Sequence, residues 1–200
     1  MQTSFALPDS ITSGKTSNGT SWCRIGTGPT LVLLHGVGMN KSVWAPEVNM
    51  LSESFDVVIY DMWGHGESDL PSSELNLRDY TRQLVDLLSE LEINSAFVAG
   101  HSMGALIALD FAINFPEACI GVCAMNAVFN RSPEQSSAVK KRAADLAAGG
   151  VSVNLDETLE RWFGQTGTHN FAEAETLSRE LLLDVNPKGY AAAYSVFADS

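Results

Sequence analysis

The segment Gly-His-Ser-Met-Gly at residues 100–104 combines a potential nucleophile with the small residues that a sharp turn needs. An apolar run at 96–99 precedes it and a helical pattern at 105–115 follows it, which predicts a strand–turn–helix unit. Such a turn presents a serine hydroxyl that can attack a carbonyl carbon and form an acyl-enzyme. We therefore predict that Ser102 is a catalytic nucleophile. The alternative is a chance match, because Gly and Ser are common residues.

A second glycine-containing segment, His-Gly-Val-Gly at residues 35–38, directly follows the apolar run at 30–34. The oxyanion of a tetrahedral intermediate needs two N–H donors. We expect them from the backbone amides of Val37 and of Met103, the residue after the candidate nucleophile. Taken alone, the segment would be an ordinary glycine turn at the end of a strand. Together with the serine motif, it predicts an oxyanion hole.

A third motif, Asp-Met-Trp-Gly-His-Gly-Glu-Ser at residues 61–68, follows the apolar run at 57–60. The three motifs, in this order and each after a strand, resemble the α/β-hydrolase fold, and the resemblance covers about residues 20–125. The helical stretch from residue 131 onward resembles the cap domain of that family. Including the segment at 186–194, the chain looks most similar to 3-oxoadipate enol-lactonase-like serine hydrolases.

This resemblance implies a chemistry and part of a pocket. Relatives with an aspartate in place of this serine form a covalent alkyl ester with their substrate. Ser102 instead implies an acyl substrate: an ester, lactone, thioester or activated amide. Trp63 stands where arginine is usual in the family, and we expect it to bind substrate. Tyr190 and Tyr194 recur with Phe197 along one predicted helix face. These rings would either form the roof of the acyl pocket or pack in the core beneath the cap. For both tyrosines we expect the pocket.

Four short, continuous apolar runs predict strands buried on both faces of a parallel sheet: residues 30–34, 57–60, 96–99 and 120–124. A helical pattern capped by Asn76 lies between two of them. This alternation predicts an α/β fold with a doubly wound, mostly parallel sheet. The last run would be an edge strand. No strand-like run occurs from 131 to 185, so we expect an α/β core at residues 1–130 and a helical cap or lid at residues 131–200.

Within the expected cap, capping residues and glycines predict helices at 132–149, 154–163 and 170–184, and a further helix starting at Asn186-Pro187. In this fold the nucleophile is followed by an acid and then by a histidine. Three of the histidines occupy motif loops with structural duties, and the fourth lies between two predicted cap helices: His35, His65, His101 and His169. We therefore expect the general base and its acid beyond Ser200, which would make this chain a C-terminally incomplete α/β-hydrolase.

The composition argues against several other classes of function. With 24 acidic and 12 basic residues the formal charge is −12, which disfavours nucleic acid and anionic membranes as partners. The three cysteines, at positions 23, 119 and 123, form no CxxC pair, so neither a disulfide framework nor a zinc site is expected. No signal peptide, membrane span, metal site or cofactor motif is visible. These features indicate a cytoplasmic protein.

Together the motifs predict a serine hydrolase that cleaves a small carboxylic ester or lactone through an acyl-enzyme, without a cofactor. One alternative is hydrolysis of an activated amide C–N bond by the same machinery. Another is a non-catalytic, ligand-binding member of the fold or an inactive fragment. The expected partner is a small-molecule acyl substrate, and the oligomeric state is left open.

Overall fold

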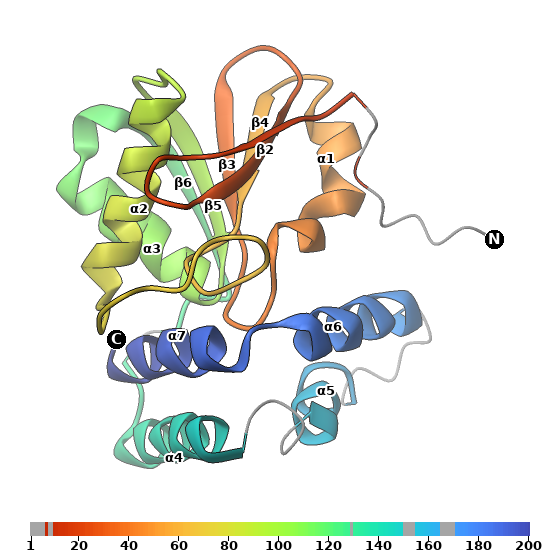
Figure 1. Ribbon diagram of the computed structural model, residues 1–200, viewed down its shortest axis with the longest axis vertical. Coiled ribbons are helices and arrows are strands. Elements are labelled where there is room, and N and C mark those ends of the chain that lie inside the picture. Colours follow the sequence, from red (N-terminus) through yellow and green to blue (C-terminus); the bar gives the residue numbers. More distant parts are fainter. Residues whose placement is uncertain (1–6, 8–9, 129, 150–154, 165–170) are drawn as a thin grey trace.

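The computed structural model describes residues 7, 10–128, 130–149, 155–164 and 171–200 (Figure 1). Its centre is a six-stranded, mostly parallel sheet in the order β1-β2-β4-β3-β5-β6. The strands are β1 (Thr12–Lys15), β2 (Ser21–Ile25), β3 (Thr30–Leu34), β4 (Asp56–Tyr60), β5 (Ala96–His101) and β6 (Cys119–Met125). β4, β3, β5 and β6 run parallel, and β1 and β2 add antiparallel pairings at one edge. The doubly wound α/β fold is confirmed, and the antiparallel hairpin is an addition.

Helices cover both faces of this sheet (Figure 1). α1 (Ala45–Leu51), which follows the 3₁₀ turn η1 (Lys41–Trp44), lies on one face, and α2 (Leu77–Glu90) and α3 (Met103–Asn114) lie on the other. The start of α2 agrees with the sequence: the Asn76 carboxamide accepts from the Asp79 amide at 3.2 Å, and the Asp79 carboxylate accepts from the Asn76 amide at 2.9 Å. This reciprocal capping satisfies two donors that the first turn of a helix otherwise leaves free.

Four further helices lie across the end of the sheet where β3 and β5 finish, and we call them the helical layer (Figure 1). They are α4 (Pro133–Gly149), α5 (Leu155–Phe163), α6 (Ala172–Asp184) and α7 (Pro187–Asp199). The predicted cap of α4 is present, since the Ser132 amide donates to Gln135 Oε1 at 2.8 Å. The expected helix starts at residues 154 and 170 lie outside the described residues. Buried leucines such as Leu159 and Leu182 join the layer to the same apolar core as Val32 and Val98 of the sheet.

The helical layer touches the sheet-side loops by direct backbone contact. A Cβ placed on Gly189 of α7 would overlap the carbonyl oxygen of Gly64, and one placed on Gly64 would come 2.6 Å from the Gly189 Cα. Because no real Cβ fits at such a separation, both positions must be glycine for α7 to sit this close to the loop at residues 61–68. This contact fixes where the layer lies above the strand ends.

β6 is the edge strand that the sequence predicted: within the described residues it pairs with β5 alone. Apolar side chains of this strand face outward, with Ile120 49% and Val122 36% exposed. An apolar groove of about 320 Å³ runs beside it between Phe55, Phe97 and Val122. An unpaired, apolar edge is a surface on which another strand can form hydrogen bonds.

Candidate active site

The turn between β5 and α3 holds Ser102 in a backbone conformation that L-residues rarely adopt, with φ 56° and ψ −115°. Glycines on either side make the turn sterically feasible. A Cβ on Gly100 would overlap the carbonyl group of Gly104, and a Cβ on Gly104 would lie 2.5 Å from the Leu34 oxygen. Strained residues held by their surroundings are concentrated at functional sites. The strand–turn–helix geometry expected around Ser102 is therefore present.

The segment after β3 passes directly beside this turn. A Cβ on Gly36 would lie 3.4 Å from the Cβ of Ser102. Among the described residues, the amide of Val37 donates to no protein acceptor. The Met103 amide belongs to the first residue of α3, where helical N–H groups lack intrahelical acceptors. Two donors of the type needed for an oxyanion are thus available near Ser102, and the helix start adds a favourable partial positive charge.

Two buried histidines tie the Gly36–Gly38 segment to the loop at residues 61–68. His35 Nε2 accepts from the Met62 amide at 3.0 Å, and His65 Nε2 accepts from the Gly38 amide at 3.1 Å. Each ring therefore carries its proton on Nδ1, which lies 2.8 Å from the Gly36 oxygen in His35 and 3.3 Å from the Trp63 oxygen in His65.

Burial keeps both rings neutral. It is the main reason that the pKa of His35 falls to about 4 and that of His65 to about 3. The expectation that these two histidines have structural duties agrees with these contacts, because each holds one end of the candidate oxyanion segment in place.

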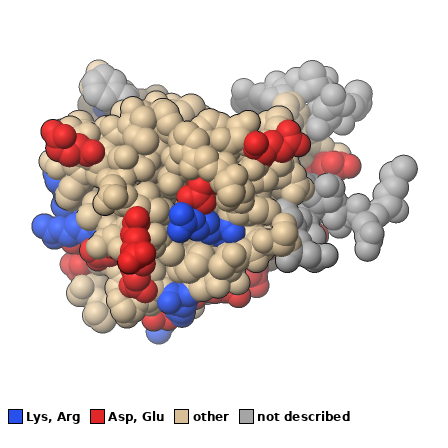
Figure 2. Space-filling view, turned by 90° about the horizontal axis from the view of Figure 1, so that it is seen from above, with Lys and Arg blue, Asp and Glu red and all other residues tan. Residues whose placement is uncertain are grey.

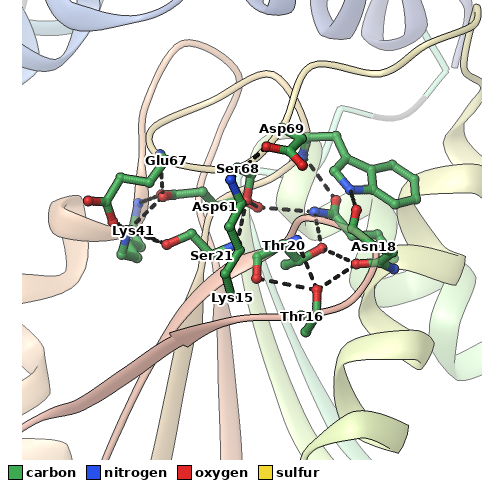
Figure 3. Close-up of polar contacts among 12 residues, drawn as sticks. Lys15, Thr16, Asn18, Thr20, Ser21, Lys41, Asp61, Glu67, Ser68 and Asp69 are labelled. Atoms are coloured by element: carbon green, nitrogen blue, oxygen red, sulfur yellow. Dashed lines mark hydrogen bonds and ion pairs between the residues drawn. The ribbon is translucent and has the colours of Figure 1, made fainter.

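A buried carboxylate provides a third tie between the same two loops (Figure 3). Asp61 is fully buried and accepts from the Lys41 amide and from Lys41 Nζ, each at 2.7 Å, and from the Glu67 amide at 2.9 Å. Lys41 Nζ also contacts the Glu67 carboxylate at 2.7 Å and Ser21 Oγ at 3.0 Å. Burial opposes the charge on Lys41, but the two carboxylates outweigh it and raise its pKa. Asp61 thus anchors the far end of the segment at 36–41.

A cavity of about 420 Å³ lies in front of Ser102, between the strand ends and the helical layer. The sheet side contributes Gly36, Val37, Met39, Val43, His101, Ser102 and Asn126. The helical layer contributes Arg161, Trp162 and Phe163 from α5 and Ser178 from α6. None of these four was expected from the sequence. The Arg-Trp-Phe run at the end of α5 could have indicated a cavity wall, but its spacing does not show which face of the helix packs against the core.

The structure brings together some of the predicted site residues and separates others. Ser102 and Val37 line the cavity, and Met103 is fully buried behind it with its amide at the helix start. Trp63 instead lines a surface depression near Asn18, whose carbonyl accepts from the indole N–H at 3.2 Å.

Tyr190 and Tyr194 are buried at the base of the helical layer, and neither is among the residues that line the cavity. A Cβ on Gly38 would lie 3.1 Å from the ring of Tyr190, and Tyr194 Oη accepts from Arg142 at 3.1 Å. Their positions fit the packing alternative better than a pocket roof.

The groups around Ser102 include one candidate proton acceptor among the described residues. His101 lines the cavity, and partial burial lowers its pKa, so the ring is neutral at pH 7. No carboxylate of the described chain lines this cavity, and His169 lies outside the described residues. No cluster of three or more His, Cys, Asp or Glu side chains suited to a metal ion occurs within the described ranges. No helix in this part of the chain is long and apolar enough to cross a membrane.

Residues 29–196 match the family described as the alpha/beta hydrolase fold, and the chain belongs to this family. It is 33% identical over 173 residues to the (E)-2-((N-methylformamido)methylene)succinate hydrolase of Acinetobacter baylyi, covering 86% of this chain and 64% of that protein. It is similar to the solved enol-lactonase of Burkholderia xenovorans with a TM-score of 0.81 at 27% identity, covering 92% of this chain and 72% of that one. A thermophilic esterase from Thermogutta terrifontis, 22% identical, shares the fold with a TM-score of 0.83, covering 94% and 72% of the two chains.

These findings confirm the expected resemblance to α/β-hydrolases and to enol-lactonases. The chain spans 64% of the length of the succinate hydrolase it matches.

Proposed function

We propose that this chain carries the nucleophile and oxyanion hole of a serine hydrolase acting on a small acyl substrate, an ester or lactone. The single observation that carries the proposal is the strained backbone of Ser102 at the mouth of a cavity, beside the unpaired amide of Val37. In this mechanism Ser102 Oγ attacks the substrate carbonyl carbon and passes its proton to a general base, while the amides of Val37 and Met103 stabilise the resulting oxyanion. The tetrahedral intermediate then collapses, the C–O bond to the leaving group breaks, and the alcohol leaves with the proton from the base. Water attacks the acyl-enzyme in the same way, which releases the acid and restores the Ser102 hydroxyl.

We further propose that residues 131–200 act as the cap of this site and residues 1–130 as its core. The support is the placement of α5 and α6, whose side chains close one side of the cavity at Ser102. For the partner we propose a small molecule and not a nucleic acid. The formal charge of −12 supports this choice. So does the face in Figure 2, where Lys and Arg side chains stand apart from one another among acidic ones.

A serine-directed fluorophosphonate tests the nucleophile. Incubation followed by peptide mass spectrometry should show one adduct, on Ser102, because the proposed donors, the amides of Val37 and Met103, would stabilise the phosphonyl oxygen. Ser102→Ala should abolish the adduct, whereas Ser89→Ala, at an exposed position on α2, should leave it unchanged. An adduct that persists in Ser102→Ala would overturn the assignment.

An activated amide is the second candidate for the scissile bond. It is favoured by the 33% identity to a relative whose name specifies an N-methylformamido-methylene compound. The same Ser102 chemistry would apply, with an amine and not an alcohol as leaving group. Parallel measurements of kcat/KM on an enol ester and on an N-acyl enamine of equal size separate the two. If kcat/KM is higher for the N-acyl enamine and the reaction depends on Ser102, the amide replaces the ester as the proposed scissile bond.

A further inference from the structure

A buried hydroxyl without a hydrogen-bond partner borders the cavity at Ser102. It belongs to Ser178, which lies in the middle of α6, is only 9% exposed and lines this cavity from the helical layer. Among the described residues, its side chain forms no hydrogen bond. Buried polar groups in proteins nearly always have a partner, so a free buried hydroxyl at a cavity indicates a place where a ligand atom binds.

Ser178 differs in this respect from every other buried serine or threonine in the described ranges. The side chains of the others all form hydrogen bonds: Thr16, Thr20, Ser21, Ser68, Thr81 and Thr158. A hydroxyl within a helix can donate to the carbonyl oxygen four residues earlier, as Thr176, two residues before Ser178 on α6, does at 2.8 Å. Ser178 does not form the corresponding bond, so its hydroxyl is left for whatever occupies the cavity.

The neighbours of Ser178 on α6 place it close to the candidate oxyanion segment. Leu182 follows Ser178 by four residues, so the two side chains lie about 6 Å apart along the same helix face. A Cβ on Gly38 would come 2.9 Å from Leu182 Cδ2, so this leucine packs directly on the segment. Ser178 lies one turn earlier and borders the same cavity of about 420 Å³ as Val37 and Ser102. A small molecule with its carbonyl group at Ser102 can therefore reach Ser178 with another part of its structure.

The surroundings of this hydroxyl favour an uncharged partner. The other buried residues of α6 are Leu177, Leu181 and Leu182, so the face that carries Ser178 is otherwise apolar. An ionised group among leucine side chains loses its hydration at a high cost, whereas a hydroxyl costs far less to desolvate. A hydroxyl also both donates and accepts, and it can therefore pair with Ser178 whichever way the serine proton is turned.

We propose that Ser178 binds a hydroxyl group of the substrate, so that the cavity favours acyl compounds with a hydroxyl on the acyl chain over plain alkyl ones. A compound with a methyl group at that place leaves the buried serine hydroxyl without a partner, and this costs free energy. The inference deepens the proposed function and rests on it for the word substrate. The binding of a hydroxyl at Ser178 is argued from the cavity alone.

The experiment compares two pairs of methyl esters in which a hydroxyl replaces a methyl group of similar size. The pairs are methyl β-hydroxybutyrate with methyl isovalerate, and methyl γ-hydroxybutyrate with methyl valerate. Dissociation constants are measured on the Ser102→Ala chain by NMR, from the indole N–H resonance of Trp162, which lines the same cavity. Adding Ser178→Ala should weaken binding of the hydroxy ester relative to its methyl partner by about twofold to tenfold in at least one pair, the range for a neutral hydrogen bond.

Thr176→Ala is the matched control, because Thr176 lies on the same helix, is exposed and is not among the residues that line the cavity. It should leave both affinity ratios unchanged. Urea unfolding without ligand should show that Ser178→Ala is at least as stable as its parent, because the change removes a buried hydroxyl that has no partner.

Three results would overturn the proposal. The first is an unchanged affinity ratio for both pairs in Ser178→Ala, which is also the result if the ligand hydroxyl binds another polar group of the cavity such as Asn126. The second is no binding of any of the four esters to the parent chain. The third is a clear loss of stability in Ser178→Ala, which would show that the hydroxyl has a structural partner. Since the Ser102 hydroxyl is absent from the assay, failure of Ser102 as a nucleophile would leave these results unaffected.

Discussion

Acidification from about pH 7.5 to about pH 5 should lower the free energy of unfolding by about 4 kcal/mol through His35 and His65 together. Both rings are neutral in the folded state, with pKa values of about 4 and about 3, against an ordinary value of 6.5. At pH 5 the unfolded chain has bound a proton on each ring and the folded chain has not. Each ring then favours unfolding by about 1.5 pH units times 1.36 kcal/mol, or about 2 kcal/mol.

The free energy of unfolding falls with falling pH because both pKa values are lowered in the folded state. The stabilising contribution is fully present above pH 6.5, falls as the pH drops through the unfolded value, and levels off only below about pH 4 for His35 and about pH 3 for His65. The charged groups nearest the rings are Lys41, which opposes protonation of His35, and Asp61, which favours protonation of His65. The rings also face each other at 5.3 Å between centroids, so one protonated ring disfavours the other.

Urea unfolding at a series of pH values measures this effect, with His65→Gln as the comparison. Glutamine can accept a hydrogen bond but does not titrate, so the variant should lose about 2 kcal/mol of the pH dependence between pH 7.5 and pH 5. Carboxylates titrate in both proteins and cancel in the difference. Parallel stability curves for the two proteins would show that His65 is not buried and neutral, and would refute the reasoning.

Four further predictions concern packing and charge. Gly189→Ala should destabilise the chain by about 3 kcal/mol or more, seen as a lower melting temperature, since its Cβ would overlap the loop backbone; an unchanged melting temperature would contradict this contact. Asp61→Asn should cost about 3–5 kcal/mol in urea unfolding because it leaves the buried Lys41 ammonium poorly paired, and adding Lys41→Met should recover part of the loss. Tyr194→Ala should lower the free energy of unfolding by about 3 kcal/mol and leave fluorophosphonate labelling of Ser102 unchanged; the reverse pattern would restore the pocket role. Val122→Lys should increase the monomer fraction in light scattering if the β6 edge drives self-association of the chain; equal association of both proteins would exclude that edge.

The parts of this structure that the sequence predicted are those determined by neighbouring residues. The buried strands, the elbow at Ser102 and the cap at Asn76 each depend on a few consecutive side chains whose sizes and donors limit the backbone. The hairpin of β1 and β2 was missed because β1 is short and largely exposed, so it carries no apolar run. A strand that pairs antiparallel at an edge needs only one buried face, so its apolar pattern in the sequence is weak.

The cavity wall was less predictable because it depends on how the helical layer docks. Arg161 and Trp162 line the cavity through the orientation of α5, which tertiary packing sets and the spacing of apolar residues does not reveal. The docking of the helical layer also decides where Tyr190 and Tyr194 lie. Their spacing predicted a shared face correctly, and the structure places that face in the core of the layer and not on the cavity. Trp63 was assigned by resemblance, and its hydrogen bond to Asn18 holds it elsewhere.

The contact between Gly64 and Gly189 has a consequence for how the helical layer can be exchanged among related proteins. Most helix packing adapts to substitution, because side chains can change rotamer or size while the helix axis moves slightly. Here peptide backbone rests on peptide backbone, so neither partner has a side chain that could adjust. A foreign helical layer could be grafted onto this sheet only if it brought a glycine at the position of Gly189 and met Gly64 in the same orientation. Any other graft would push against the loop that also carries His65, and the disturbance would reach the Gly38 amide through one hydrogen bond. Exchange of the helical layer is therefore constrained at this single pair of glycines.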